Sequence, residues 1–238
     1  MSTFILIHGA WHGAWCWHKV AALLEDSGHT VLAPDLPALG IDRTPLHSAS
    51  LQGYADRVCE SLDACGEAAY LVGHSMGGIA ITQAAEAMPH KVKTLVYLTA
   101  FLLPSGRSLI EEAQTDVTAQ VLPNLVFAPD KSWAIVKPEA MRAVFYADCS
   151  SADIALARSL LVPQAAAPFI APVQTTAGRW GSIPRVYIEC TEDRAISLAA
   201  QRSMYRQLPC QRIYSMASSH SPFLSAPEAL CQHLLSLA

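Results

Sequence analysis

The chain has 238 residues with a formal net charge of −4, and 52% of them are hydrophobic against 15% charged. This length suits one domain with a large core, and the apolar content argues against extended disorder. The acidic balance, with no dense stripe of Lys and Arg, argues against nucleic acid as a partner, and no apolar run reaches the roughly 20 residues of a membrane span.

The first hundred residues alternate predicted strands and helices. Each predicted strand is a short, nearly continuous apolar run, which is typical of strands buried on both faces of a parallel sheet. Helical spacing of apolar residues and Gly or Pro at the ends mark the segments between them. The predicted strands are 3–7, 30–33, 69–72 and 92–99, and the predicted helices are 15–28, 51–64 and 75–88. This order predicts an α/β fold with helices on both faces of a mostly parallel, doubly wound sheet.

The alternation breaks between Leu103 and Gly178, where Ala, Leu and Pro are frequent and no clear strand is visible. We expect an inserted helical cap at 103–178 in a single domain, 1–238, whose core is 1–102 and 179–238. Strand and helix then alternate again, and the predicted elements are strand 185–190, helix 197–207, strand 211–216 and a last helix. For that last helix, Ser225 and Glu228 have the spacing of a capping box, with Pro227 just inside the start.

The segment Gly73-His74-Ser75-Met76-Gly77 lies between a predicted strand and a predicted helix. A serine on such a sharp turn has a strained backbone and an exposed hydroxyl, and its neighbours two positions away must be small. Ser75 is therefore the candidate nucleophile. Met76 contributes through its backbone N–H at the helix start, which can face a developing oxyanion. His74 is expected only to pack.

A second N–H donor is expected in the loop that follows the first strand, His8-Gly9-Ala10-Trp11-His12-Gly13. Ala10 is the candidate donor, because small residues let the backbone approach the substrate. Trp11 either lines the acyl pocket or packs. His8, His12 and His18 lack the spacing of a metal site, so no metal and no cofactor are expected.

The acid and the base of a serine hydrolase should follow the two last strands. Glu192 and Asp193 both come just after strand 185–190, and Asp193 is favoured because its short side chain holds an imidazole more rigidly; Glu189 lies within the strand. His220 is the histidine after the last strand, whereas His233 falls inside the final helix. His220 would remove the Ser75 proton, and Asp193 would fix the histidine tautomer.

These segments resemble the plant methylesterases and hydroxynitrile lyases of the α/β-hydrolase superfamily, including members that bind salicylate. The resemblance covers nearly the whole chain and is most specific in 8–17, 73–78 and 186–193. It implies the α/β-hydrolase fold, a triad of Ser75, Asp193 and His220, and oxyanion donors at Ala10 and Met76. It also supports Asp193 over Glu192.

The family contains two chemistries, and two positions separate them. The similar lyases carry Thr where this chain has Gly9 and Lys where it has Ser221, and that lysine stabilises departing cyanide. Both departures favour hydrolysis of esters through an acyl-enzyme on Ser75. A lyase and a non-catalytic small-ligand receptor on the same fold are the alternatives.

The substrate is expected to be a small, neutral ester of a methyl or other short alcohol, or an aromatic one, since the cap has no basic cluster. Because bacterial relatives cleave pyrethroids, larger hydrophobic esters are an alternative class of substrate. The seven scattered cysteines predict buried free thiols in a reducing cytoplasm. No signal peptide is expected, because the apolar run Thr3 to Ile7 is too short for one. The oligomeric state stays open, with a homodimer as one option. Cap residues that either line the pocket or form ordinary cap core are Leu103, Trp133, Phe145, Tyr146 and Leu160.

Overall fold

The computed structural model describes residues 1–238 and contains a six-stranded, all-parallel sheet in the order β2-β1-β3-β4-β8-β9. The apolar runs of the sequence form these strands because both faces of the sheet are covered; every residue of β1 and β3 is buried. The strands are β1 Thr3–Ile7, β2 Thr30–Leu32, β3 Ala69–His74, β4 Val92–Leu98, β8 Arg185–Cys190 and β9 Arg212–Met216. Each overlaps its predicted segment closely.

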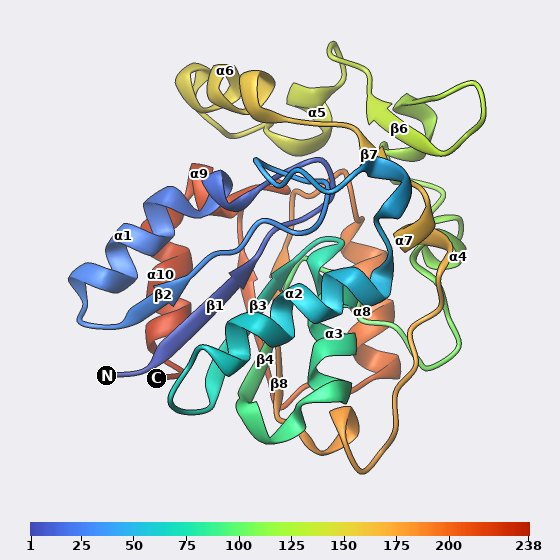
Figure 1. The fold of residues 1–238 in the computed structure, drawn as a ribbon. Helices are drawn as coiled ribbons and strands as arrows, with labels where there is room; N and C mark the ends of the chain where they lie inside the picture. Colours follow the sequence, from blue (N-terminus) through green and yellow to red (C-terminus); the bar gives the residue numbers. More distant parts are fainter.

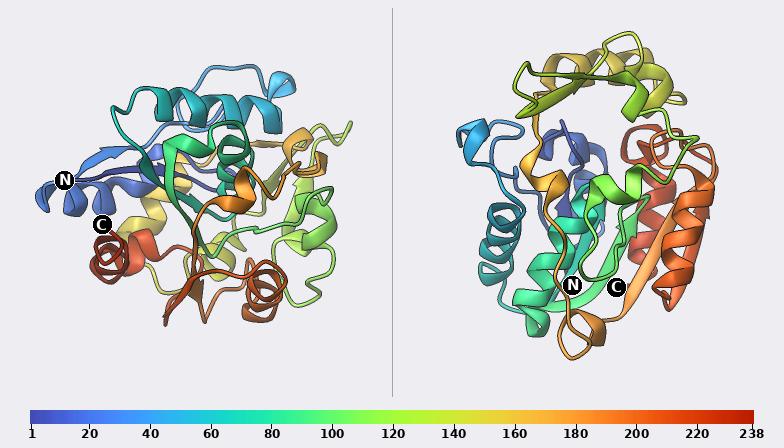
Figure 2. Two further views of the ribbon diagram at one scale, coloured as in Figure 1. Left: turned by 90° about the horizontal axis from the view of Figure 1, so that it is seen from below. Right: turned by 90° about the vertical axis from the view of Figure 1, so that its right-hand side faces the viewer.

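Helices cover both faces of the sheet, as expected. Helices α1 and α10 pack against each other on one face, and α2 and α3 pack together on the other (Figures 1 and 2). The helices of the core are α1 His18–Asp26, α2 Leu51–Asp63, α3 Gly77–Ala87, α8 Leu198–Gln207, α9 Pro222–Ser225 and α10 Pro227–Leu235. None of the helices has the length and apolarity needed to cross a membrane.

Much of the region between β4 and β8 lies over the carboxyl ends of the strands, at the top and right of Figure 1, and the chain then descends to the start of β8 at the bottom. It contains three short antiparallel strands, in the order β5-β6-β7, that the sequence pattern did not predict. These strands have only two to four residues, so they leave no long apolar run. The elements are α4 Leu109–Ala113, β5 Leu125–Phe127, β6 Trp133–Val136, α5 Met141–Phe145, α6 Ser151–Leu160, β7 Gln164–Ala165 and α7 Ala167–Ile170.

The capping box predicted at the last helix is wrong. Ser225 ends the short helix α9, and its N–H donates to the carbonyl of Ser221. Helix α10 instead begins at Pro227 with Ala226 before it and no side-chain cap. The chain therefore makes one helical turn, α9, shortly after His220. Ser225 belongs to this turn and does not cap α10, the helix for which the pattern predicted it.

Candidate active site

Ser75 occupies a strained turn between β3 and α3. Its φ of 53° lies in the left-handed region, so the helix begins at Gly77 and not at Ser75. A Cβ on Gly77 would lie 2.7 Å from the carbonyl oxygen of Ile7, and one on Gly73 would lie 2.8 Å from the Gly77 carbonyl. Only glycine fits at both positions, and this close approach holds the serine at the carboxyl end of the sheet.

An apolar cavity opens onto Ser75, and both predicted oxyanion donors line it. Ala10 and Met76 border this cavity together with Ser75. Both residues are buried, and neither backbone N–H donates a hydrogen bond within the protein. Buried backbone donors are almost always paired, so two unpaired N–H groups beside one serine are unusual. They are suited to a substrate oxygen that becomes negative.

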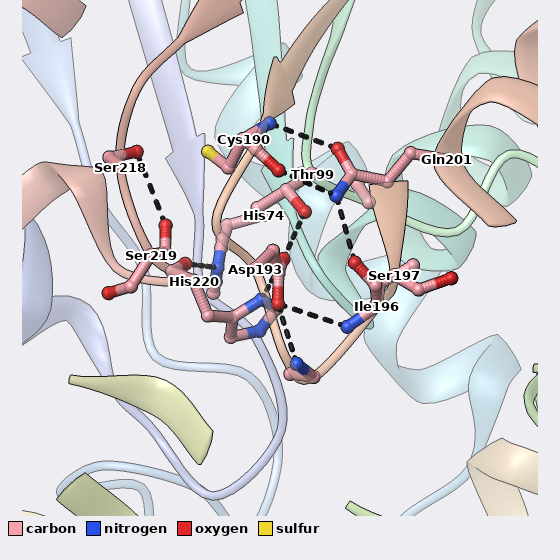
Figure 3. Close-up of polar contacts among 12 residues, drawn as sticks. His74, Thr99, Cys190, Asp193, Ile196, Ser197, Gln201, Ser218, Ser219 and His220 are labelled. Carbon is pink, nitrogen blue, oxygen red and sulfur yellow. Dashed lines mark hydrogen bonds and ion pairs between the residues drawn. The ribbon is translucent and has the colours of Figure 1, made fainter. Parts of the chain in front are cut away.

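Asp193 and His220 are brought together from two loops at the ends of β8 and β9. Figure 3 shows the imidazole of His220 pointing toward the Asp193 carboxylate, and His220 Nδ1–H donates to Asp193 Oδ2 at 2.6 Å. Nδ1 therefore carries the proton, which leaves Nε2 free as an acceptor. Both side chains are nearly inaccessible to solvent. This geometry suits a base whose orientation and tautomer are fixed by a carboxylate.

The His220 imidazole lies against the neighbour of Ser75 in the chain. The neighbour of Ser75, His74, donates from Nε2–H to the His220 carbonyl at 2.8 Å, and the two imidazole centroids are 4.5 Å apart. The ring of Phe145, which also lines the cavity, lies 5.6 Å from that of His220. The Ser75 hydroxyl itself makes no hydrogen bond within the protein. Catalytic hydrogen bonds of this kind often form only when substrate is bound.

The other carboxylates near the site have different surroundings. The Glu192 side chain is exposed and accepts no hydrogen bond. Glu189 is buried and accepts hydrogen bonds from Arg202 at 3.1 and 2.9 Å, from Tyr205 at 2.9 Å and from Ser215 at 2.5 Å. It therefore joins β8 to α8 and β9 and does not contact His220.

Three of the histidines near the site are held by the protein. His8 donates to the Gly9 carbonyl and accepts from the Leu36 N–H, while His12 donates to the Ala10 carbonyl at 2.7 Å. Burial lowers the pKa of His12 to about 3 and holds the pKa of His74 well below its usual value. Burial also lowers the pKa of His8, so all three imidazoles are neutral around pH 7.

Two of the six predicted pocket residues, Trp11 and Phe145, line the cavity. The other four, Leu103, Trp133, Tyr146 and Leu160, do not. Leu103 is fully buried in the core, and the hydroxyl of Tyr146 donates to His12 Nε2 at 2.6 Å. Their size and position in the sequence did not reveal that they lie outside the cavity lining.

Several residues that organise the site were not found from the sequence. Thr99, at the end of β4, has a φ of 35° and donates from its hydroxyl to Asp193 Oδ2 at 2.5 Å. Asp148, between β4 and β8, accepts hydrogen bonds from the N–H and the hydroxyl of Ser219, next to His220. Gln164, from the same region, accepts from the Trp11 N–H. Each of the three bonds to a residue far away in the sequence, and no local sequence motif predicts such a contact.

The family model described as "Alpha/beta hydrolase family" matches residues 4–233. The chain belongs to the alpha/beta hydrolase family. It is 35% identical to methylesterase 7 of Arabidopsis thaliana, over 99% of this chain and 95% of that protein. It is 33% identical to salicylic acid-binding protein 2 of Nicotiana tabacum, over 99% and 96% of the two chains. The crystal structure of polyneuridine aldehyde esterase superposes with a TM-score of 0.91 at 28% identity, covering 100% and 99% of the two chains.

These comparisons agree with the fold and the family expected from the sequence. An alpha/beta hydrolase places its nucleophile on a sharp strand-to-helix turn and an oxyanion donor in an earlier loop. Ser75 and Ala10 lie in those two places in this chain. The similarity extends over the whole length, so it includes both the core and the region that covers the cavity.

Proposed function

We propose that this alpha/beta hydrolase is a serine carboxylesterase that acts through an acyl-enzyme on Ser75. The observation that carries the proposal is the position of Ser75: a left-handed turn, beside an apolar cavity, next to two unpaired N–H groups. The similarity to methylesterases and esterases over the full chain supports a carboxylic ester hydrolase.

The proposed reaction has two halves. His220 Nε2 accepts the Ser75 proton as the serine oxygen attacks the ester carbonyl, and the oxyanion is bound by the N–H groups of Ala10 and Met76. The tetrahedral intermediate collapses, the C–O bond to the alcohol breaks, and His220 donates its proton to the leaving alkoxide. Water then repeats the sequence against the acyl-enzyme, while Asp193 stabilises the imidazolium in each half.

The lining of the cavity favours a neutral, compact substrate. Of its 20 lining residues, 17 are hydrophobic, and its charged residues, Glu112 and Asp116, are both acidic. A negatively charged acyl group would be repelled there and would find no cationic partner. We therefore propose methyl or other short-alcohol esters, including aromatic ones, as substrates.

We also propose that residues 103–178 act as one inserted cap over a core formed by 1–102 and 179–238. The support is that β5, β6 and β7 pair only with one another and lie outside the six-stranded sheet. A cytoplasmic location is proposed as well, because the seven cysteines form no disulfide.

The decisive experiment measures turnover of p-nitrophenyl acetate by the wild type and by Ser75→Ala and His220→Ala. Each substitution should lower kcat by roughly 10⁶, because nucleophile and base act as a unit. Ser159→Ala, which removes an exposed hydroxyl of α6, is the matched control and should retain full activity. Equal, slow turnover by wild type and Ser75→Ala would disprove the esterase and favour a non-catalytic receptor.

Mandelonitrile separates ester hydrolysis from the lyase chemistry of the same family. A Cβ on Gly9 would lie 2.9 Å from both Ser75 Cβ and His74 Nδ1, so the threonine of the lyases does not fit here without rearrangement. Ser221 also supplies no ammonium group for cyanide. We expect no cyanide release, and its detection at a rate comparable to ester turnover would contradict the proposal.

A further inference from the structure

Trp11 follows the candidate oxyanion donor Ala10 directly and has an unfavourable backbone. Its φ is 63°, in the left-handed region that a bulky side chain rarely adopts. Such a conformation persists only where the surrounding structure holds it. The contacts that hold Trp11 therefore also determine where the Ala10 N–H points.

All three polar groups of Trp11 are held by one part of the molecule, the region between β4 and β8. Its indole Nε1–H donates to the Ala134 carbonyl at 2.9 Å, and its own carbonyl accepts from the Val162 N–H at 3.0 Å. Its backbone N–H donates to Gln164 Oε1 at 3.4 Å. Ala134 and Gln164 are register partners in the β6–β7 pair. We call Ala134, Val162 and Gln164 the Trp11 clamp.

Gln164 is the clamp residue that holds Trp11 through its side chain, and that side chain is itself held by hydrogen bonds. It is 1% exposed, and its Nε2 donates to the Tyr54 hydroxyl at 3.0 Å and to the Ala165 carbonyl at 2.9 Å. With the amide nitrogen engaged in this way, Oε1 faces the Trp11 N–H. Gln164 does not line the cavity, so changing it removes no contact with the substrate.

The clamp fixes the peptide unit that follows the Ala10 N–H. His12 Nδ1–H holds the Ala10 carbonyl, and Gln164 accepts from the Trp11 N–H on the same peptide unit. The N–H of the preceding peptide unit, on Ala10, is left without an acceptor beside Ser75. Both groups of the Ala10–Trp11 peptide are thus fixed, and the direction of the free donor follows from them.

We propose that Gln164 is a positioning residue for the oxyanion hole, acting from the cap through Trp11 on the Ala10 N–H. This inference rests on the proposed esterase function. It assigns to the cap a role in stabilising the transition state in addition to covering the cavity. Hydrogen-bond donors accelerate acyl transfer only when they are preorganised toward the developing charge, so loosening the clamp should affect the transition state more than substrate binding.

The test compares Gln164→Leu with the wild type in p-nitrophenyl acetate hydrolysis. We expect kcat to fall roughly 10- to 100-fold with KM changed less than about twofold, because a displaced donor is worth somewhat less than one removed outright. Gln164→Glu, which keeps the Oε1 acceptor, should recover part of the loss. If Gln164→Leu does not fold, Tyr54→Phe, which removes one anchor of the amide, provides the comparison, and wild-type kcat in this variant would overturn the proposal.

A matched pair of inhibitors separates positioning from general damage. Trifluoroacetophenone forms a hemiketal in which the Ser75 oxygen bonds to the carbonyl carbon, the carbonyl oxygen becomes the oxyanion and the serine proton passes to His220. Acetophenone fills the same cavity with little tendency to form that adduct. In Gln164→Leu the inhibition constant for trifluoroacetophenone should rise by the same factor as kcat falls, while that for acetophenone should stay unchanged. Equal weakening of both would indicate a structural role only.

The control is Gln83→Leu. Gln83, on α3, also accepts through Oε1 from a distant backbone N–H, that of Gln174, at 2.6 Å, but it lies away from the loop. It should keep wild-type kcat and trifluoroacetophenone affinity. If Ser75→Ala retains wild-type turnover, the esterase proposal fails; if Ser75→Ala is inactive and Gln164→Leu keeps full kcat, only the clamp fails.

Discussion

The acid of the candidate triad and the oxyanion loop are held by different parts of the molecule. Asp193 accepts hydrogen bonds from Thr99, from the N–H groups of Ala195 and Ile196 at 2.6 and 3.0 Å, and from His220. All of these donors belong to loops at the carboxyl ends of core strands. Trp11, in contrast, is held entirely from residues 103–178.

This difference indicates a division of labour. In the proposed reaction, the geometry for proton transfer is set by the loops at the carboxyl ends of the core strands. The geometry for oxyanion stabilisation depends, in our proposal, on the contacts that residues 103–178 make with Trp11. Substitutions in the two regions should therefore change different steps, and the following predictions test whether they do.

The largest effect is expected at the acid. Asp193→Asn keeps the shape of the side chain but lets an amide donor face His220 Nδ1, which favours the wrong tautomer and removes the negative charge; kcat should fall by roughly 10⁴. Acetophenone affinity should not change. Glu192→Gln, one position earlier and exposed, is the control and should behave as wild type. A comparable loss in Glu192→Gln would move the acid to that residue.

A smaller effect is expected at Thr99, which donates to the same carboxylate oxygen as His220. Thr99→Val keeps the volume and removes the hydroxyl, and a hydrogen bond to a charged group contributes about 1.5–3 kcal/mol. We expect kcat to fall roughly 10-fold, with trifluoroacetophenone affinity reduced in proportion, since the adduct also protonates His220. Thr99→Ser should restore most of the activity, and an unchanged kcat in Thr99→Val would show that the carboxylate needs no support from β4.

The difference between the two regions also explains what could be predicted from sequence. The core strands and the Ser75 turn carry local signals: an apolar run, then glycines two positions on either side of a serine. Asp193 and His220 could be proposed because they follow strands whose order was already clear. The Ser75 turn needed only its immediate neighbours in the chain, whereas Asp193 and His220 also needed the order of the strands and the family resemblance.

The cap gives no comparable signal. Strand β7 has two residues, and the buried Gln164 side chain is bonded to Trp11 and Tyr54, both more than 100 residues away. The sequence is compatible with Tyr146 as a pocket residue or as part of the core of this region, and in the structure its hydroxyl donates to His12. Contacts between segments so far apart are fixed by tertiary packing, which propensity and periodicity do not encode.

Glu189 gives the smallest expected effect on turnover, and it tests whether the core can be weakened without disturbing either half of the site. Its hydrogen bonds from Arg202, Ser215 and Tyr205 lower its pKa to about 2. A carboxyl whose pKa is depressed in the folded state stabilises the fold above its unfolded pKa of about 4.5, and this contribution is lost as the pH falls toward 2. Removing the charge with Glu189→Gln should therefore lower the free energy of unfolding at pH 7 by up to about 3 kcal/mol.

Urea unfolding of wild type and Glu189→Gln at several pH values between 7 and 2.5 measures this contribution. The difference in unfolding free energy should be constant down to about pH 5 and then shrink, because only the wild type has this carboxylate to protonate. At pH 7, below the unfolding transition, kcat should remain that of the wild type, since Glu189 contacts neither His220 nor the Trp11 clamp. A loss of kcat in the folded variant would show that α8 and β9 transmit strain to the catalytic loops. Neither the Asp193–His220 pair nor the oxyanion loop would then be independent of the core that carries Glu189.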